Sequence, residues 1–240
     1  MLLSLLSGGS LQSIIIELLL LMPIILFSLS FHETAHGFVA YKCGDPTAHN
    51  LGRLSLNPLR HLDPIGFLSM LLIGYGWAKP VPVNSRYFRN PKRGMALTAA
   101  AGPLSNLLLG LICTVLLAFF NVWRFRLMMN VEISSFFIDA VTYLCNVFSL
   151  SAYINFVFAF FNLIPIPPFD GSRIAFVFLP QKYYFKIMRY ERQIMFGLLI
   201  TLFALSYFFD FSPTGFLADG LISVIGNPLC DFFAKLLLAQ

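Results

Sequence analysis

A long apolar run ends in Phe31-His32-Glu33-Thr34-Ala35-His36-Gly37. The pattern predicts an α-helix, in which two histidines four residues apart lie on one face, about 40° apart around the axis. His32 and His36 can therefore bind one metal ion from the same side, and Glu33 lies beside that face. A zinc hydrolase requires two neutral nitrogen ligands, an open position for water and a carboxylate that accepts the water's proton. The alternative is a hydrogen-bonded helix end without a metal.

The composition is that of a polytopic membrane protein. Of the 240 residues, 58% are hydrophobic and 11% are charged, whereas a soluble domain carries about 25% charged residues. Ionisable side chains inside a membrane are costly and usually functional, which favours the metal-site interpretation. The net charge of +5 is attributed to loops facing an anionic membrane surface. No nucleic-acid partner is expected, because no basic face with interleaved aromatic residues is present.

Long apolar segments predict membrane-spanning helices over residues 11–41, 95–120, 141–164 and 194–209. The expected fold class is an all-α polytopic membrane protein, a bundle of about four to six transmembrane helices. Residues 1–240 are expected to form a single membrane-embedded domain. The sequence leaves open whether the tail, residues 211–240, crosses the membrane, re-enters it or lies on its surface.

The region between the first two spans, residues 42–94, is rich in basic residues and turn formers. Residues 51–56 and 81–84 are predicted to form short strands, as a small β-hairpin, and the apolar stretch between them predicts a re-entrant or interfacial helix. An extended substrate could pair with these strands, or they could form a surface sheet without that role. His49 and His61 are potential further ligands, but hydrogen-bonded or surface roles are expected.

The distribution of basic residues predicts the topology. Residues 42–94 hold eight of them and residues 165–193 hold five, whereas none precedes residue 42 and two lie in the polar connection 121–140. The positive-inside rule therefore places 42–94 and 165–193 in the cytoplasm. The first and third spans then end on the same side, which brings Asp170 to the depth of the two histidines. Three prolines precede Asp170 and end the helix, so Asp170 is expected on a turn.

The chain resembles the site-2 protease family of intramembrane metalloproteases in three elements that occur in the family's order. These are His32-Glu33-x-x-His36, Gly102-Pro103-x-x-Asn106 and Asn162-x-x-Pro165-x-Pro167-x-x-Asp170-Gly171. The chain resembles a minimal catalytic core of this family, without the PDZ-like or CBS module that many members carry.

The resemblance implies a role for each of these side chains. His32, His36 and Asp170 would bind one Zn²⁺ per chain, Glu33 would be the general base, and Asn106 would stabilise the oxyanion or position the substrate. The implied enzyme is a zinc metalloendopeptidase that cleaves within or next to transmembrane segments. It would serve regulated intramembrane proteolysis or clear signal-peptide remnants.

The implied setting is a multi-pass protein of the plasma (inner) membrane, with its active site near the cytoplasmic face. Its partners would be the lipid bilayer and a transmembrane protein or signal-peptide substrate. Zinc over another divalent ion rests on the ligand types and on the family.

Three other functions compete with this interpretation. One is a membrane-anchored metalloprotease with a soluble substrate, against which the lack of a sizeable soluble domain in this sequence counts. A catalytically inactive family member could bind membrane proteins, although the intact Glu33 argues against it. A zinc transporter would need further ligands along a path through the membrane, and the chain has no histidine after His61. The sequence does not indicate the identity of the substrate, the need for a prior cleavage or the oligomeric state.

Overall fold

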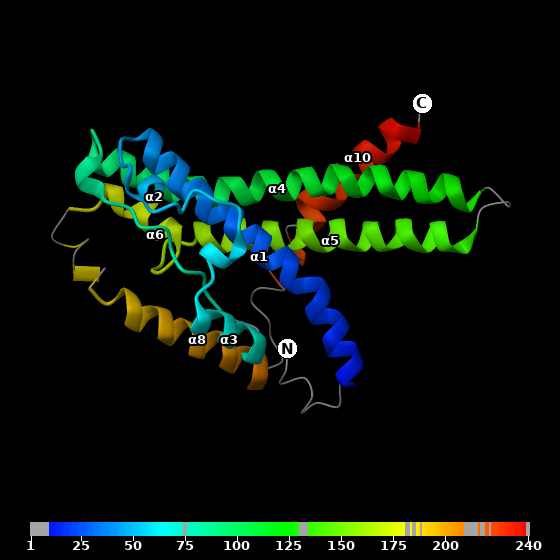
Figure 1. The fold of residues 1–240 in the computed structure, drawn as a ribbon, viewed down its shortest axis with the longest axis horizontal. Coiled ribbons are helices and arrows are strands. Elements are labelled where there is room, and N and C mark those ends of the chain that lie inside the picture. The colour runs from blue at the N-terminus through cyan, green and yellow to red at the C-terminus, as the bar shows by residue number, and fades with distance from the viewer. Residues whose placement is uncertain are drawn as a thin grey trace. The chain divides into compact units, whose positions relative to one another are not determined.

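The computed structural model describes residues 10–73, 76–129, 134–180, 183, 186–187, 189–208, 216, 219–220 and 222–238. Within this part of the chain, four helices are long and apolar enough to cross a membrane (Figure 1). They are α1 (Leu11–Lys42, apolar over Leu18–Lys42), α4 (Pro91–Met128), α5 (Ser135–Leu163) and α8 (Glu191–Phe208). The helical, multi-pass character predicted from the sequence is confirmed, and the number of long helices is near the lower end of the expected range.

Shorter elements connect the long helices. Between α1 and α4 lie α2 (Thr47–Asn50), η2 (Pro58–Arg60), α3 (Pro64–Ile73) and η3 (Ser85–Tyr87). Between α5 and α8 lie α6 (Asp170–Ala175) and η4 (Phe176–Phe178), and after α8 come the π-helix η5 (Ile222–Gly226) and α10 (Asn227–Leu238). With ten residues, α3 is about 15 Å long, half the thickness of the hydrocarbon core. Such a helix fits the re-entrant or interfacial segment expected before α4.

The chain divides into two compact units, residues 1–106 with 158–213 and residues 107–157 with 214–240. In the second unit, the parts of α4 and α5 that belong to it lie side by side (Figure 1) and share a core of Cys113, Ala152 and Phe156. The rings of Phe120 and Phe148 stack there at 5.2 Å. The first unit contains all the residues predicted to form the metal site. The expectation of a single domain over residues 1–240 stays a prediction.

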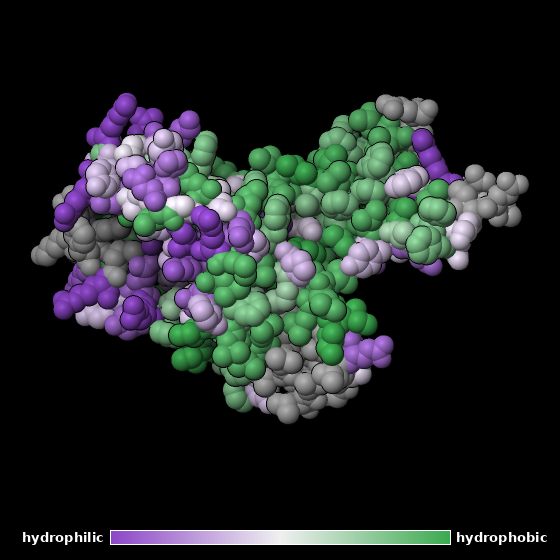
Figure 2. Space-filling model, in the orientation of Figure 1, coloured by the Kyte–Doolittle hydropathy of each residue, from purple (hydrophilic) through white to green (hydrophobic). Residues whose placement is uncertain are grey.

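The surface of the long helices is strongly apolar. Along α4, Leu104, Leu108 and Ile112 are each about half exposed at four-residue spacing, as expected for a helix face in contact with lipid. On the face seen in Figure 2, hydrophilic residues gather instead around α2 and α6 of the first unit. This polar surface lies next to the helix ends that hold the predicted site.

The predicted β-hairpin is wrong. In the described part of residues 42–94, β pairing is limited to an isolated antiparallel bridge between Leu62 and Ala78. The carbonyl of Ser55 accepts hydrogen bonds from the side chains of Thr34 and His61 at 2.8 and 2.7 Å, so it does not pair with a strand. In the second predicted strand, Pro82 has no N–H to donate to a ladder.

The connection between α4 and α5 is shorter than predicted, and part of the tail is helical. The polar connection predicted over residues 121–140 is much shorter, because α4 continues to Met128 and α5 begins at Ser135. In this continuation the rings of Phe120 and Trp123 contact each other, with centroids 5.8 Å apart and ring planes tilted by 39°. The tail contains α10, whose 12 residues are too few to cross the hydrocarbon core. Residues 211–215, 217–218, 221 and 239–240 of the tail lie outside the described residues.

Candidate metal centre

Two ligands of the candidate centre come from adjacent turns of α1. His32 and His36 are both buried, and their rings meet edge to face with centroids 4.5 Å apart. The two Nε2 atoms are 2.9 Å apart. The helical spacing predicted from the sequence therefore brings both Nε2 atoms to one point.

The third candidate ligand, Asp170, is delivered by the chain reversal after α5. The side chain of Asn162 donates a hydrogen bond to the Phe158 carbonyl at 2.9 Å near the end of α5, and the proline segment follows. Asp170 is the first residue of α6 rather than part of an irregular turn as predicted. Gly171 makes this reversal possible, because a Cβ at Gly171 would collide with the carbonyl of Leu163.

The three candidate ligand atoms converge. Oδ2 of Asp170 lies 3.1 Å from Nε2 of His32 and 3.1 Å from Nε2 of His36. Burial alone would raise the pKa of Asp170, but the adjacent imidazoles of His36 and His32 outweigh this effect and hold the pKa well below its usual range. Three lone pairs at such distances repel one another unless a proton or a metal cation lies among them. The donor set, two imidazoles and one carboxylate, fits a zinc ion with an open coordination position.

A backbone carbonyl of α4 fixes the orientation of His36. Its Nδ1 lies 2.7 Å from the carbonyl oxygen of Thr98. A carbonyl can only accept a hydrogen bond, so Nδ1 carries the hydrogen, and in the neutral ring the lone pair is on Nε2. Such a partner holds the ring and its tautomer in the state that binds a metal. The sequence gives no signal for this contact, because any residue at position 98 has a carbonyl.

Glu33 is next to the centre but outside the group of convergent atoms. Its Oε2 accepts a hydrogen bond from the backbone N–H of Val81 at 2.8 Å. The carboxylate is therefore held by a segment far away in the sequence. Glu33 therefore lies beside the three candidate ligands and is not one of them, and its role as the base stays a prediction.

Helix α4 approaches the two histidines through Gly102. A Cβ at this position would collide with Nε2 of His36 and lie 2.5 Å from Cε1 of His32. Asn106 follows one turn later and is fully buried. Among the described residues, its amide nitrogen and oxygen have no hydrogen-bond partner, which is costly unless a bound molecule uses them.

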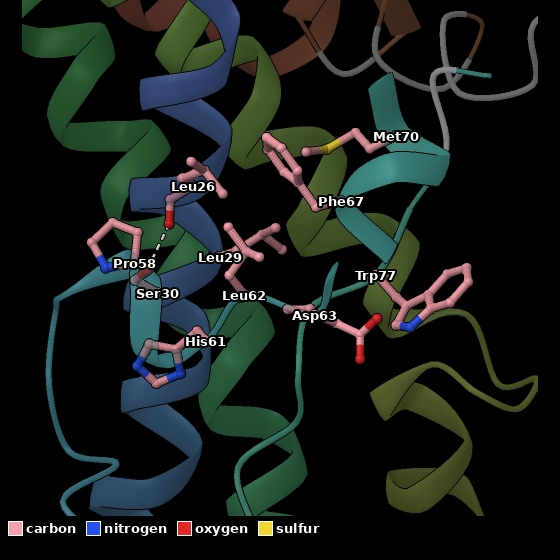
Figure 3. A pocket seen from close by; sticks show the side chains of 11 residues that line it. Leu26, Leu29, Ser30, Pro58, His61, Leu62, Asp63, Phe67, Met70 and Trp77 are labelled. Carbon is pink, nitrogen blue, oxygen red and sulfur yellow. Dashed lines mark hydrogen bonds between the residues drawn. The ribbon is translucent and has the colours of Figure 1, made fainter. Parts of the chain in front are cut away.

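The other two histidines lie outside the centre, as expected. His49 stacks on Tyr41 with ring centroids 4.9 Å apart. His61 is buried, and its Nε2 donates a hydrogen bond to the Ser55 carbonyl. His61 also borders a small cavity of about 20 Å³ together with Leu26, Ser30, Met70 and Trp77 (Figure 3). This cavity has room for about one water molecule, and none of the converging ligands lines it.

The close approach at Gly102 leads to a prediction about metal affinity. Gly102→Ala should weaken binding of a divalent metal about 10- to 100-fold, because the added methyl group displaces the imidazoles. Competition of purified protein with a metal chelator measures this affinity. Gly197→Ala in α8 is the matched control, because a Cβ there meets nothing within 4 Å. Equal metal affinity of Gly102→Ala and the wild type would contradict the packing at Gly102.

Comparison with known proteins connects this geometry to a family. The family model of Peptidase family M50 matches residues 20–205, which include every residue of the centre. Similar proteins are YwhC of Bacillus subtilis (strain 168), 42% identical over 150 residues, Rip2 of Mycolicibacterium smegmatis, 28% over 151, and MJ0611 of Methanocaldococcus jannaschii, 27% over 146. All three are provisionally named as zinc metalloproteases.

These alignments cover 62%, 61% and 60% of this chain and 64%, 52% and 62% of the three relatives, so the similarity spans less than two thirds of each relative. No solved structure matches the chain. The family model, in contrast, covers most of the chain and contains both the histidine pair and Asp170. The chain therefore belongs to Peptidase family M50, the site-2 protease family.

Proposed function

We propose that this protein is a zinc metalloendopeptidase that hydrolyses peptide bonds within or next to transmembrane segments of membrane proteins. The proposal rests on one observation. Nε2 of His32, Nε2 of His36 and Oδ2 of Asp170 lie within 3.1 Å of one another, although they belong to two segments far apart in the sequence. Membership of a peptidase family and the zinc metalloprotease names of its relatives support the same reaction and the same metal.

The proposed chemistry assigns one task to each group of the centre. His32, His36 and Asp170 hold one zinc ion, which when bound acidifies water and polarises a carbonyl group. The Glu33 carboxylate takes the proton of the attacking water and returns it to the leaving amine nitrogen. The buried amide of Asn106 donates a hydrogen bond to the oxygen on which negative charge develops, or orients the substrate.

The position of the histidines within a membrane-spanning helix indicates the class of substrate. His32 and His36 lie in the candidate span Leu18–Lys42, so the centre is reached most directly by chains that are themselves in the membrane. A helical transmembrane segment hides its carbonyls in its own hydrogen bonds, so it must unwind locally before cleavage. Release of regulatory domains and removal of signal-peptide remnants are both compatible with such a site.

We further propose that the centre lies near the cytoplasmic face of a plasma (inner) membrane. Eight basic residues in 42–94 and five in 165–193 flank the ends of α1 and α5 that hold the centre. The positive-inside rule places these segments on the cytoplasmic side.

The assignment of Glu33 predicts a separation of metal binding from turnover. Glu33→Gln should retain zinc and lose cleavage about 10²- to 10⁴-fold, the usual contribution of a general base, whereas His36→Ala should lose both. The measurements are zinc content by mass spectrometry and cleavage of tagged single-span membrane proteins and signal-peptide remnants produced in the same cells. A Glu33→Gln protein that cleaves at the wild-type rate would remove Glu33 from the mechanism.

The proposed topology makes a prediction for reporter fusions. Green fluorescent protein fused after Arg93 should fluoresce and alkaline phosphatase there should be inactive, because the basic residues of 42–94 are retained in the cytoplasm. Fusions after Met129, beyond α4, should behave in the opposite way. If the two fusion sites give the reverse pattern, the centre faces the other side of the membrane.

A further inference from the structure

A backbone amide holds the carboxylate of Glu33. Val81 lies in an extended segment 48 residues after Glu33, and its N–H donates a hydrogen bond to Oε2 at 2.8 Å. Val81 is only 8% exposed, so water competes poorly for this hydrogen bond. A bond between a backbone N–H and an ionised carboxylate is stronger than one between neutral groups.

The sequence around Val81 leaves this amide as a single donor. Val81 lies between Pro80 and Pro82, and proline has no N–H. The tripeptide Pro80-Val81-Pro82 therefore has one backbone N–H, and that N–H is directed at Glu33. A strand that recruits a substrate by β-augmentation needs free backbone donors along its edge, which this tripeptide does not offer.

The segment that carries Val81 is fixed on both sides. Nη2 of Arg53 donates to the carbonyls of Lys79 and Pro80 at 2.8 and 3.3 Å. On the other side, the fully buried carboxylate of Asp45 accepts a hydrogen bond from the backbone N–H of Asn84 at 2.6 Å. These bonds hold the backbone around Val81 in place, so the direction of its N–H is determined before any substrate binds.

We propose that the Val81 N–H positions Glu33 for catalysis, and that Arg53 acts indirectly by holding the segment. The hydrogen bond fixes one carboxylate oxygen, Oε2, and thereby the plane of the carboxylate, so that Oε1 is the oxygen that takes up the proton. This proposal rests on the proposed function of Glu33 as the general base. It gives residues 79–84 a role in orienting the base instead of binding the substrate strand.

Hydrogen exchange tests the contact without any substrate. Val81 supplies the one exchangeable backbone hydrogen of Pro80-Val81-Pro82, so overlapping peptides in mass spectrometry can isolate it. In the zinc-loaded protein we expect slow exchange, about tenfold or more faster exchange in Glu33→Ala, and exchange close to wild type in Glu33→Gln, which keeps an acceptor oxygen. Equal exchange in wild type and Glu33→Ala, with zinc content retained, would overturn the contact.

Kinetics then test the positioning role on a tagged single-span membrane protein that the wild type cleaves. Val81→Pro, which removes the N–H, should lower kcat about tenfold or more with KM and zinc content unchanged. Val81→Ala keeps the N–H and should lose less. Arg53→Gln should lower kcat in the same way as Val81→Pro, which covers the case that Val81→Pro does not fold. Wild-type or increased kcat in a folded Val81→Pro or in Arg53→Gln would overturn the proposal.

The proposed function and the positioning role of Val81 can be tested separately. If the wild type cleaves no membrane protein, the proposed function fails, while the exchange experiment still reports whether Val81 contacts Glu33. If the wild type cleaves and Glu33→Gln does not, but folded Val81→Pro cleaves at the wild-type rate, the function stands and the positioning role is wrong.

Discussion

The rest of the candidate site depends on the convergence of three buried ligand atoms. Nε2 of His32, Nε2 of His36 and Oδ2 of Asp170 lie within 3.1 Å of one another, which is unfavourable unless a proton or a metal cation lies among them. The folded chain nevertheless brings them together from α1 and from the start of α6. Close contacts at Gly102 and Gly171 and the hydrogen bond from His36 to the Thr98 carbonyl leave these side chains little freedom to separate. The fold therefore holds three candidate ligand atoms at one point, from two segments far apart in the sequence.

Hydrogen bonds fix the polar loop beside this centre. Four side chains form hydrogen bonds with backbone atoms of residues 42–94, those of Arg53, Asp45, Thr34 and His61. This network replaces the hydrogen bonds of a β-sheet and fixes a segment without regular structure beside α1. An irregular segment near a membrane is tolerated when its polar groups are satisfied within the protein, and here one of them, the Val81 N–H, is bonded to Glu33.

Much of the fold and of the candidate site could be predicted from the sequence because both depend on simple periodicities. The apolar segments gave the four long helices, and the four-residue spacing of His32 and His36 placed both on one helix face. The β-hairpin was wrong because alternating residues at 51–56 resemble a strand, whereas side chains of Thr34 and His61 occupy the Ser55 carbonyl. The contacts of Thr98 and Val81 were missed because they involve backbone atoms. The partners of backbone atoms depend on the tertiary structure and cannot be recognised from the residue types.

The central claim is that Asp170 completes a metal site with the two histidines of α1. Zinc content of the purified protein, measured by mass spectrometry for the wild type and for Asp170→Ala, tests it most directly. The exposed Asp139 of α5 provides the matched control, Asp139→Ala. The account predicts about one zinc per chain in the wild type and the control, and weakened or lost zinc in Asp170→Ala, as for a catalytic zinc with three protein ligands. Undiminished zinc in Asp170→Ala would contradict the account.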